Sequence, residues 1–193
     1  MRFNKRQILT IPNLLSLLRL LMIPLFIWLY LHGYEGWTAF VLILSGLTDV
    51  VDGYIARHYN QVSDFGKAFD PIADKLTQAA MLLCLLTRYP TMIVPFLLLA
   101  VKDVFNAVSG LVVIRRTGVV FGAEWHGKLT TVLLYGMMIL HVVWQDIPQW
   151  ASNTLNAGCV VMMLVSFVLY AQRNTQAIRN AKKQEHHQED DLL

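Results

Sequence analysis

The sequence predicts an all-α protein that spans a membrane with six helices, on the basis of its composition and the spacing of its apolar segments. The 193 residues are 55% hydrophobic and only 15% charged, whereas soluble domains usually carry about 25% charged residues. A single small core cannot bury so much apolar surface, so lipid is the expected solvent for much of it. The mean hydropathy of +0.47 agrees with this prediction.

Six segments approach the roughly 20 apolar residues that a membrane-spanning helix needs. They cover residues 11–31, 37–57, 69–86, 92–114, 129–144 and 150–170. Glycine or proline interrupts the sequence between several of them, at Gly33, Gly36, Pro90 and Pro148. The short connections predict helical hairpins. The first segment is long and is followed by no cleavage signature, so we expect a retained helix and not a signal peptide.

The positively charged residues predict the orientation, because cytoplasmic segments near a membrane carry an excess of Lys and Arg. Such residues precede the first segment, flank the second and fourth connections and follow the last segment, whereas the opposite side has only Arg88. Both termini are therefore expected in the cytoplasm. We expect residues 1–172 to form the membrane domain. Residues 173–193 end in KKQEHHQEDDLL and are expected to form a frayed polar cytoplasmic tail.

Four aspartates lie in the second and third segments, where a charged side chain is costly and usually functional. Asp49 and Asp52 are three residues apart and Asp70 and Asp74 are four apart, so each pair shares a helix face. If the two faces meet, repulsion between the carboxylates requires a cation. Hard oxygen ligands suit Mg²⁺, Mn²⁺ or Ca²⁺. Hydration or pairing with a lysine explains one such aspartate but not four at these spacings.

Small residues and an arginine accompany the aspartates. Gly53 and Ala56 leave room for a ligand near the backbone, and Arg57 places a planar cation where a phosphate can bind. Small residues also serve close helix packing in membranes, so by themselves they do not indicate a ligand. A cation transporter is a rival interpretation, but a conduction path needs polar groups across the bilayer, and these aspartates group toward one face. A purely structural protein gives no reason for the acidic cluster.

The spacing D-x2-D-G-x2-A-R-x8-G-x3-D-x3-D, which runs from Asp49 to Asp74, resembles the full signature of the CDP-alcohol phosphotransferase family. This resemblance implies a six-helix membrane enzyme, commonly a homodimer, that transfers a phosphatidyl group from CDP-diacylglycerol to an alcohol and releases CMP. It implies two Mg²⁺ or Mn²⁺ ions, with Asp74 as a ligand and also as the general base. The metal ligands are expected to be Asp49, Asp52, Asp70 and Asp74, and the CDP-binding positions Gly53, Ala56, Arg57 and Gly66.

The acceptor alcohol has two candidates. The segments IPNLLSLLRLLMIP and FDPIADKL resemble bacterial phosphatidylglycerophosphate synthases, whose acceptor is glycerol 3-phosphate. These synthases usually carry Arg-Glu where this chain has Lys102-Asp103, and CMP-forming cardiolipin synthases, whose acceptor is phosphatidylglycerol, have a related Arg-Asp there. Arg115, Arg116 and Lys128 are candidates for binding an acceptor phosphate, although topology-setting charges beside anionic lipid explain them equally well. We expect an active site that faces the cytoplasm from the cell membrane, and no nucleic-acid partner.

Overall fold

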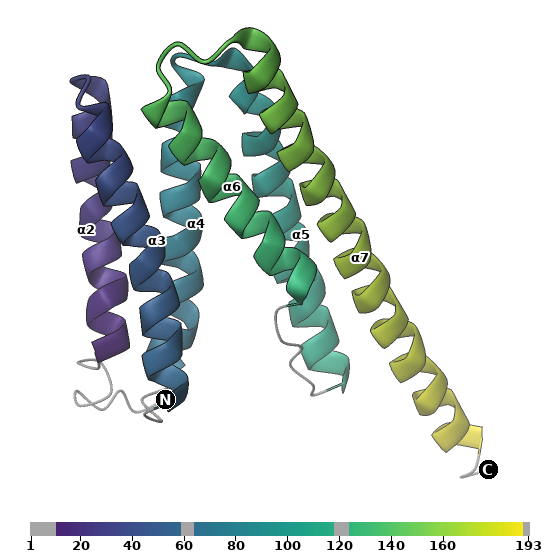
Figure 1. Cartoon of the computed structure of the whole chain (residues 1–193). Helices are drawn as coiled ribbons and strands as arrows, with labels where there is room; N and C mark the ends of the chain where they lie inside the picture. The colour runs from purple at the N-terminus through teal and green to yellow at the C-terminus, as the bar shows by residue number, and fades with distance from the viewer. Residues whose placement is uncertain (1–10, 59–63, 118–123, 191–193) are drawn as a thin grey trace. The chain divides into compact units, whose positions relative to one another are not determined.

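The computed structural model describes residues 11–58, 64–117 and 124–190, with side chains for 14–48, 51, 70–115 and 124–180. These residues form helices and no strand (Figure 1). The α-helices are α2 (Ile11–Leu31), α3 (Glu35–His58), α4 (Asp64–Leu86), α5 (Ile93–Thr117), α6 (Trp125–Val143) and α7 (Gln149–Asp190), and a 3₁₀ turn, η1 (Pro90–Met92), precedes α5.

The predicted all-α class is confirmed, and the six helices correspond to the six expected apolar segments. In the described part of the chain, four stretches are long and apolar enough to cross a membrane: Leu14–Leu31, Pro90–Arg115, Trp125–Val143 and Gln149–Asn180. These stretches belong to α2, to η1 with α5, to α6 and to α7. Membrane crossing by α3 and α4 stays a prediction.

The last helix differs most from expectation. It does not fray after the apolar segment ends near Tyr170 but continues to Asp190. The added sequence is rich in Ala, Gln, Lys, Arg and Glu, which are strong helix formers. A polar composition prevents a packed core but does not by itself prevent a helix. Arg173 contacts Glu124, the residue before α6, and Asn174 contacts Ser109 of α5. The division into a membrane domain of residues 1–172 and a cytoplasmic tail stays a prediction.

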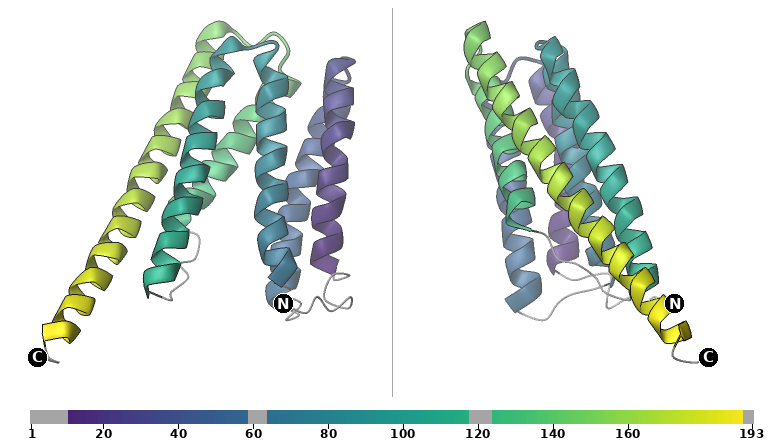
Figure 2. Two further views of the ribbon diagram at one scale, coloured as in Figure 1. Left: turned by 180° about the vertical axis from the view of Figure 1, so that it is seen from behind. Right: turned by 90° about the vertical axis from the view of Figure 1, so that its right-hand side faces the viewer.

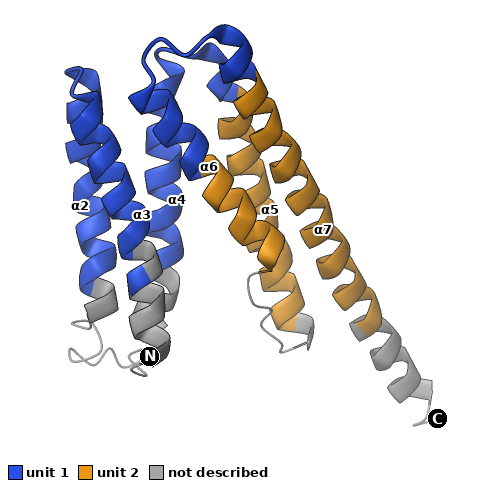
Figure 3. Cartoon of the chain, viewed as in Figure 1, with its two compact units in different colours: residues 1–93, 135–153 blue, residues 94–134, 154–193 orange. Residues whose placement is uncertain are grey.

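The chain divides into two compact units (Figure 3). Unit 1 comprises Met1–Ile93 and Tyr135–Asn153, and unit 2 comprises Val94–Leu134 and Thr154–Leu193. Unit 1 therefore contains α2, α3 and α4 with the end of α6. Unit 2 contains most of α5, the first half of α6 and most of α7.

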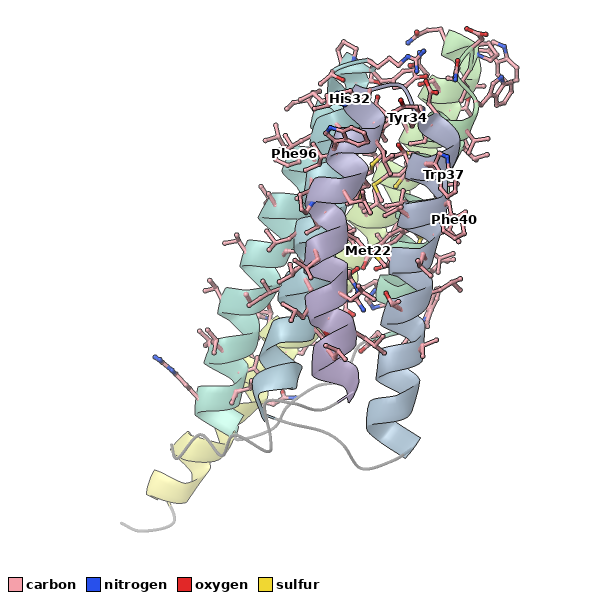
Figure 4. All side chains as sticks on the ribbon, turned by 90° about the vertical axis from the view of Figure 1, so that its left-hand side faces the viewer. Met22, His32, Tyr34, Trp37, Phe40 and Phe96 are labelled. Atoms are coloured by element: carbon pink, nitrogen blue, oxygen red, sulfur yellow. The ribbon has the colours of Figure 1, made fainter. Side chains whose placement is uncertain are left out.

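In unit 1, α2 packs against both α3 and α4, and the three helices lie side by side in all views (Figure 2). Met22 of α2 is buried, together with Phe26 and Leu42. By contrast, Trp37 and Phe40 of α3 are more than half exposed and point away from α2 (Figure 4). Large apolar side chains on the outside of the unit suit a lipid environment.

The turn between α2 and α3 requires a glycine. Gly33 has a φ of 76°, a backbone conformation that residues other than glycine rarely adopt. The amide of Tyr34 donates to the carbonyl of Leu29 at 2.9 Å, and the amide of Gly33 donates to that of Tyr30 at 3.1 Å. These are the two hydrogen bonds of a Schellman motif. The turn reverses the chain, so the C-terminal half of α3, with Asp49 and Asp52, runs toward the end of the unit where α4 begins.

In unit 2, α7 packs against α5 through aromatic and polar contacts. The rings of Phe105 and Phe167 meet edge to face, with their centroids 5.0 Å apart. Further along the same helices, the side-chain amide of Asn174 donates to the hydroxyl of Ser109 at 2.8 Å. Asn174 is only 4% exposed, so this hydrogen bond satisfies a polar group that is costly to bury.

Candidate active site

Two aspartates of the predicted site lie one turn apart in α4. Asp70 and Asp74 are both half-buried. The hydroxyl of Ser16, on the neighbouring α2, donates a hydrogen bond to Oδ1 of Asp70. Ser16 is fully buried, and α2 packs against α4. The hydrogen bond therefore links the Asp70 carboxylate to a neighbouring packed helix.

The carboxylate of Asp74 accepts one hydrogen bond on each oxygen. The phenolic hydroxyl of Tyr135, on α6, donates to Oδ1 at 3.1 Å. The side-chain amide of Gln78, one turn further along α4, donates to Oδ2 at 2.8 Å. Lys75 contributes a cation 3.9 Å from the same Oδ2. An ionised carboxylate accepts about four hydrogen bonds or metal contacts, so both oxygens keep capacity for a further ligand.

Helix α2, which carries Ser16, also contains a buried arginine. Arg19 is fully buried and follows Ser16 by three residues, so the two side chains share a helix face. A charge inside a membrane helix is expensive and indicates a polar interior. The sequence interpretation did not assign a role to Arg19, although its place within an apolar segment was a usable signal.

The other half of the predicted metal site lies on α3. Asp49, Asp52, Gly53, Ala56 and Arg57 belong to the helical backbone of α3, and Gly66 to that of α4, but they lie outside the residues whose side chains are described. Within the described residues, no group of three or more His, Cys, Asp or Glu could hold a metal ion. Asp70 and Asp74 nevertheless supply hard oxygen donors, so this half of the site fits a divalent cation in its chemistry.

The candidate acceptor residues belong to unit 2. Arg115 on α5 and Lys128 on α6 are both exposed, so each is accessible to an anion, and no described contact joins them. Arg116 lies outside the described side chains. In the same unit, Lys102 is almost fully buried and its Nζ lies 3.7 Å from Oδ1 of Asp103, in agreement with an ion pair between these neighbours.

Unit 2 also holds a polar group that the sequence interpretation missed, called here the Glu124 cluster: Glu124, His126, Ser166, Tyr170 and Arg173. Oε1 of Glu124 accepts from Nη1 of Arg173 at 3.0 Å, and Oε2 lies 3.3 Å from Nε2 of His126. The backbone amide of Glu124 donates to the hydroxyl of Tyr170 at 3.1 Å. The cluster thereby joins the start of α6 to α7.

The Glu124 cluster has two further contacts. Nδ1 of His126 lies 3.1 Å from the hydroxyl of Ser166, and the guanidinium of Arg173 lies 4.8 Å from the ring centroid of Tyr170, a cation–π distance. The hydrogen bond from Arg173 holds the pKa of Glu124 below its ordinary value, against a smaller opposing effect of burial; the positive charge of Arg173 adds to the lowering. Glu124 therefore keeps its negative charge, which Arg173 balances, and this pairing indicates a structural role.

Comparison with known proteins decides the family. The family model described as CDP-alcohol phosphatidyltransferase matches residues 9–170. The chain belongs to the CDP-alcohol phosphatidyltransferase family. The matched region includes Asp70 and Asp74 and most of the helical part of the chain. CDP-alcohol phosphatidyltransferases generally use divalent metal ions, in agreement with the oxygen donors on α4.

Similar proteins carry two kinds of name. A Mycobacterium tuberculosis (strain H37Rv) protein named putative cardiolipin synthase is 31% identical over 93% of this chain and 90% of its own length. The CDP-diacylglycerol–glycerol-3-phosphate 3-phosphatidyltransferase of Aquifex aeolicus is 33% identical over 87% of this chain and 97% of its own length. The CMP-forming cardiolipin synthase of Streptomyces coelicolor is 46% identical, but over 39% of this chain and 38% of that protein.

Proposed function

We propose that this phosphatidyltransferase moves the phosphatidyl group of CDP-diacylglycerol to glycerol 3-phosphate, which forms phosphatidylglycerophosphate and releases CMP. The observation that carries this proposal is the pair Asp70 and Asp74, which lie one turn apart in α4 and whose carboxylates accept hydrogen bonds from residues of α2, α4 and α6. It is supported by the family match over residues 9–170 and by the similarity to the Aquifex aeolicus enzyme over nearly its full length.

The proposed reaction assigns a task to each predicted residue. Asp49, Asp52, Asp70 and Asp74 would hold the divalent cations, which we propose to be two Mg²⁺ or Mn²⁺ ions. When bound, these ions would supply positive charge to the diphosphate and to the CMP leaving group. The cytidine nucleotide and its diphosphate lie at the positions Gly53, Ala56, Arg57 and Gly66.

Asp74 acts as the general base in this proposal. Its carboxylate takes the proton from the acceptor hydroxyl as the hydroxyl oxygen forms a bond to the phosphorus that bears the diacylglycerol. The bond between that phosphorus and the bridging oxygen breaks, and the oxygen leaves with CMP. Arg115, Arg116 and Lys128 bind the phosphate of the acceptor; the exposure of Arg115 and Lys128 supports this role.

Phosphatidylglycerol is the second candidate acceptor, and its product is cardiolipin. The specific observation in its favour is the similarity to the Mycobacterium tuberculosis protein named putative cardiolipin synthase, which extends over most of both chains. The same Asp74 and the same cation site serve either reaction, because only the alcohol differs.

The decisive assay measures CMP release by the purified protein with CDP-diacylglycerol and Mg²⁺ or Mn²⁺. Glycerol 3-phosphate, phosphatidylglycerol, inositol phosphate and serine are supplied as separate acceptors. Release with glycerol 3-phosphate alone is the expected result. Release with phosphatidylglycerol alone establishes the second candidate, and no release with any acceptor contradicts the proposed reaction.

We also propose that all six helices cross the cell membrane with both termini and the active site toward the cytoplasm. α3 and α4 have 24 and 23 residues, or about 35 Å of helix, which exceeds the hydrocarbon thickness of roughly 30 Å. Single cysteines at the exposed positions Gln145 and Gln176 test this topology in a Cys84→Ser/Cys159→Ser background. A membrane-impermeant maleimide applied to intact cells should label Gln145→Cys and not Gln176→Cys; the reverse pattern contradicts the orientation.

The proposed enzyme is a homodimer, as its resemblance to the family implies. Exposed apolar residues recur along α5 at Val101, Val104, Val108 and Leu111, a stripe that either lipid or a second copy of the chain can cover. The mass of the detergent-solubilised protein, measured by light scattering and corrected for detergent, should be that of two chains. A mass of one chain contradicts this proposal.

A further inference from the structure

We infer that Tyr135 and Gln78 are positioning residues, which together fix the plane and direction of the Asp74 carboxylate. This inference deepens the proposed function, because it assigns residues outside the aspartate motif to the orientation of the base and metal ligand. Its basis is that the two donors engage different oxygens of one carboxylate: Tyr135 engages Oδ1 at 3.1 Å and Gln78 engages Oδ2 at 2.8 Å.

The two donors come from different parts of the fold. Gln78 lies on the same helix as Asp74, one turn away, whereas Tyr135 lies on α6 and is separated from Asp74 by 61 residues of sequence. All three belong to unit 1. A carboxylate with a single partner can still rotate about its bond to Cβ. Donors on both oxygens from two helices remove that rotation, so the remaining lone pairs keep fixed directions.

The chemistry of the donors suits positioning more than neutralisation. A phenol and an amide are uncharged at neutral pH, so they orient the carboxylate without cancelling its charge. Gln78 is only 1% exposed, and a buried amide is costly unless it is hydrogen-bonded. Partners that hold a ligand from outside the metal shell set its orientation, and their loss usually lowers metal affinity or activity about 10- to 100-fold.

The test compares Tyr135→Phe with Tyr89→Phe. Each substitution removes one phenolic hydroxyl in unit 1, but the hydroxyl of Tyr89 donates to the backbone carbonyl of Gln145 at 3.4 Å and not to an aspartate. Tyr135→Phe should lower kcat for CMP release about tenfold, with KM for both substrates changed less than about twofold, and should weaken Mn²⁺ binding about tenfold in an electron paramagnetic resonance titration. Tyr89→Phe should leave all these values unchanged.

A second variant tests the donor to the other carboxylate oxygen, Oδ2 of Asp74. Gln78→Met keeps the length of the side chain and removes the amide donor, so it should show the same two losses as Tyr135→Phe. It also serves as the test if Tyr135→Phe does not fold. Wild-type kcat and wild-type Mn²⁺ affinity in either folded variant overturn the inference, because a merely structural hydrogen bond changes thermal stability alone.

The Mn²⁺ titration separates this inference from the proposed reaction. If the wild-type protein releases no CMP with any acceptor while Tyr135→Phe still weakens Mn²⁺ binding, the reaction is wrong and the positioning role stands. If the wild-type protein is active and neither variant changes kcat or Mn²⁺ affinity, the reaction stands and the positioning role is wrong.

Discussion

Asp74 in unit 1 and Glu124 in unit 2 are both carboxylates with several described partners, but the charges of these partners differ. Asp74 accepts hydrogen bonds from the neutral Tyr135 and Gln78, and the described cation beside it, Lys75, lies 3.9 Å away. Glu124 accepts a hydrogen bond from the guanidinium of Arg173 at 3.0 Å, and a histidine lies 3.3 Å from its other oxygen. The protein supplies a close counter-charge for Glu124.

The difference separates a structural carboxylate from a functional one. A charge that is paired by a guanidinium stabilises a local contact, and little of its field remains for a ligand. A charge that is held by neutral donors keeps its attraction for a cation or a proton. Residue type alone does not distinguish the two carboxylates, whereas the charges of their partners do.

The largest expected effect is on activity, at Asp74. Asp74→Asn keeps the shape of the side chain but removes the charge and the base, so CMP release should fall at least about 100-fold. Helix content and elution volume in detergent should stay unchanged. The control is Asp146→Asn, which removes an exposed carboxylate from the turn between α6 and α7. Full activity of Asp74→Asn would contradict the functional role of Asp74, and with it the distinction from the structural Glu124.

A smaller effect on stability is expected at Gly127. A Cβ there would lie 2.5 Å from the hydroxyl of Tyr170, so Gly127→Ala must displace the ring and break its hydrogen bond with the backbone amide of Glu124. The expected cost is about 1 kcal/mol, the usual net value of one hydrogen bond. Unfolding of the purified protein in mixed micelles measures it.

Gly136→Ala is the matched control on the same helix, because no atom lies within 4 Å of the added Cβ. Its stability should equal or slightly exceed that of the wild type, since alanine favours helix over glycine. Equal stabilities of the two variants contradict the packing described for the Glu124 cluster. CMP release should change less than about twofold in both, because neither residue contacts Asp74.

The smallest expected effect concerns the pH dependence of stability at Glu124. The pKa of Glu124 is lowered in the folded protein, mainly by the hydrogen bond from Arg173, from an ordinary value of 4.5. The ion pair therefore stabilises the fold fully above pH 4.5, and this stabilisation is lost as the pH falls through the lower folded-state pKa. Glu124→Gln should melt at a lower temperature than the wild type at pH 7, and the difference should shrink below pH 4.5. A difference that grows toward acid contradicts the assignment.

The fold was largely predictable from the sequence, because a lipid solvent imposes long apolar helices whose limits glycine and proline mark. The turn at Gly33 is an example: the sequence placed a break there, and the positive φ explains it. The helical continuation of α7 to Asp190 was not predicted, because the change to polar sequence near residue 173 was interpreted as the end of ordered structure. Polarity reports burial, whereas helix propensity depends on residue type.

The candidate site was predictable only in part. Asp70 and Asp74 are four residues apart, a local spacing that indicates a shared helix face, and Gln78 continues the same spacing and was overlooked. Tyr135 and the pair Glu124–Arg173 have no such signal, because 61 and 49 residues separate the partners in these contacts. Tertiary packing brings them together, and no periodicity in the sequence encodes it.

The central claim is that the charge left on the aspartates serves a bound divalent cation in phosphatidyl transfer. Its most direct test is CMP release from CDP-diacylglycerol and glycerol 3-phosphate before and after treatment of the purified protein with EDTA, followed by addition of Mg²⁺ or Mn²⁺. The account predicts that EDTA abolishes release and that one or both ions restore it. Undiminished release in EDTA would contradict the claim.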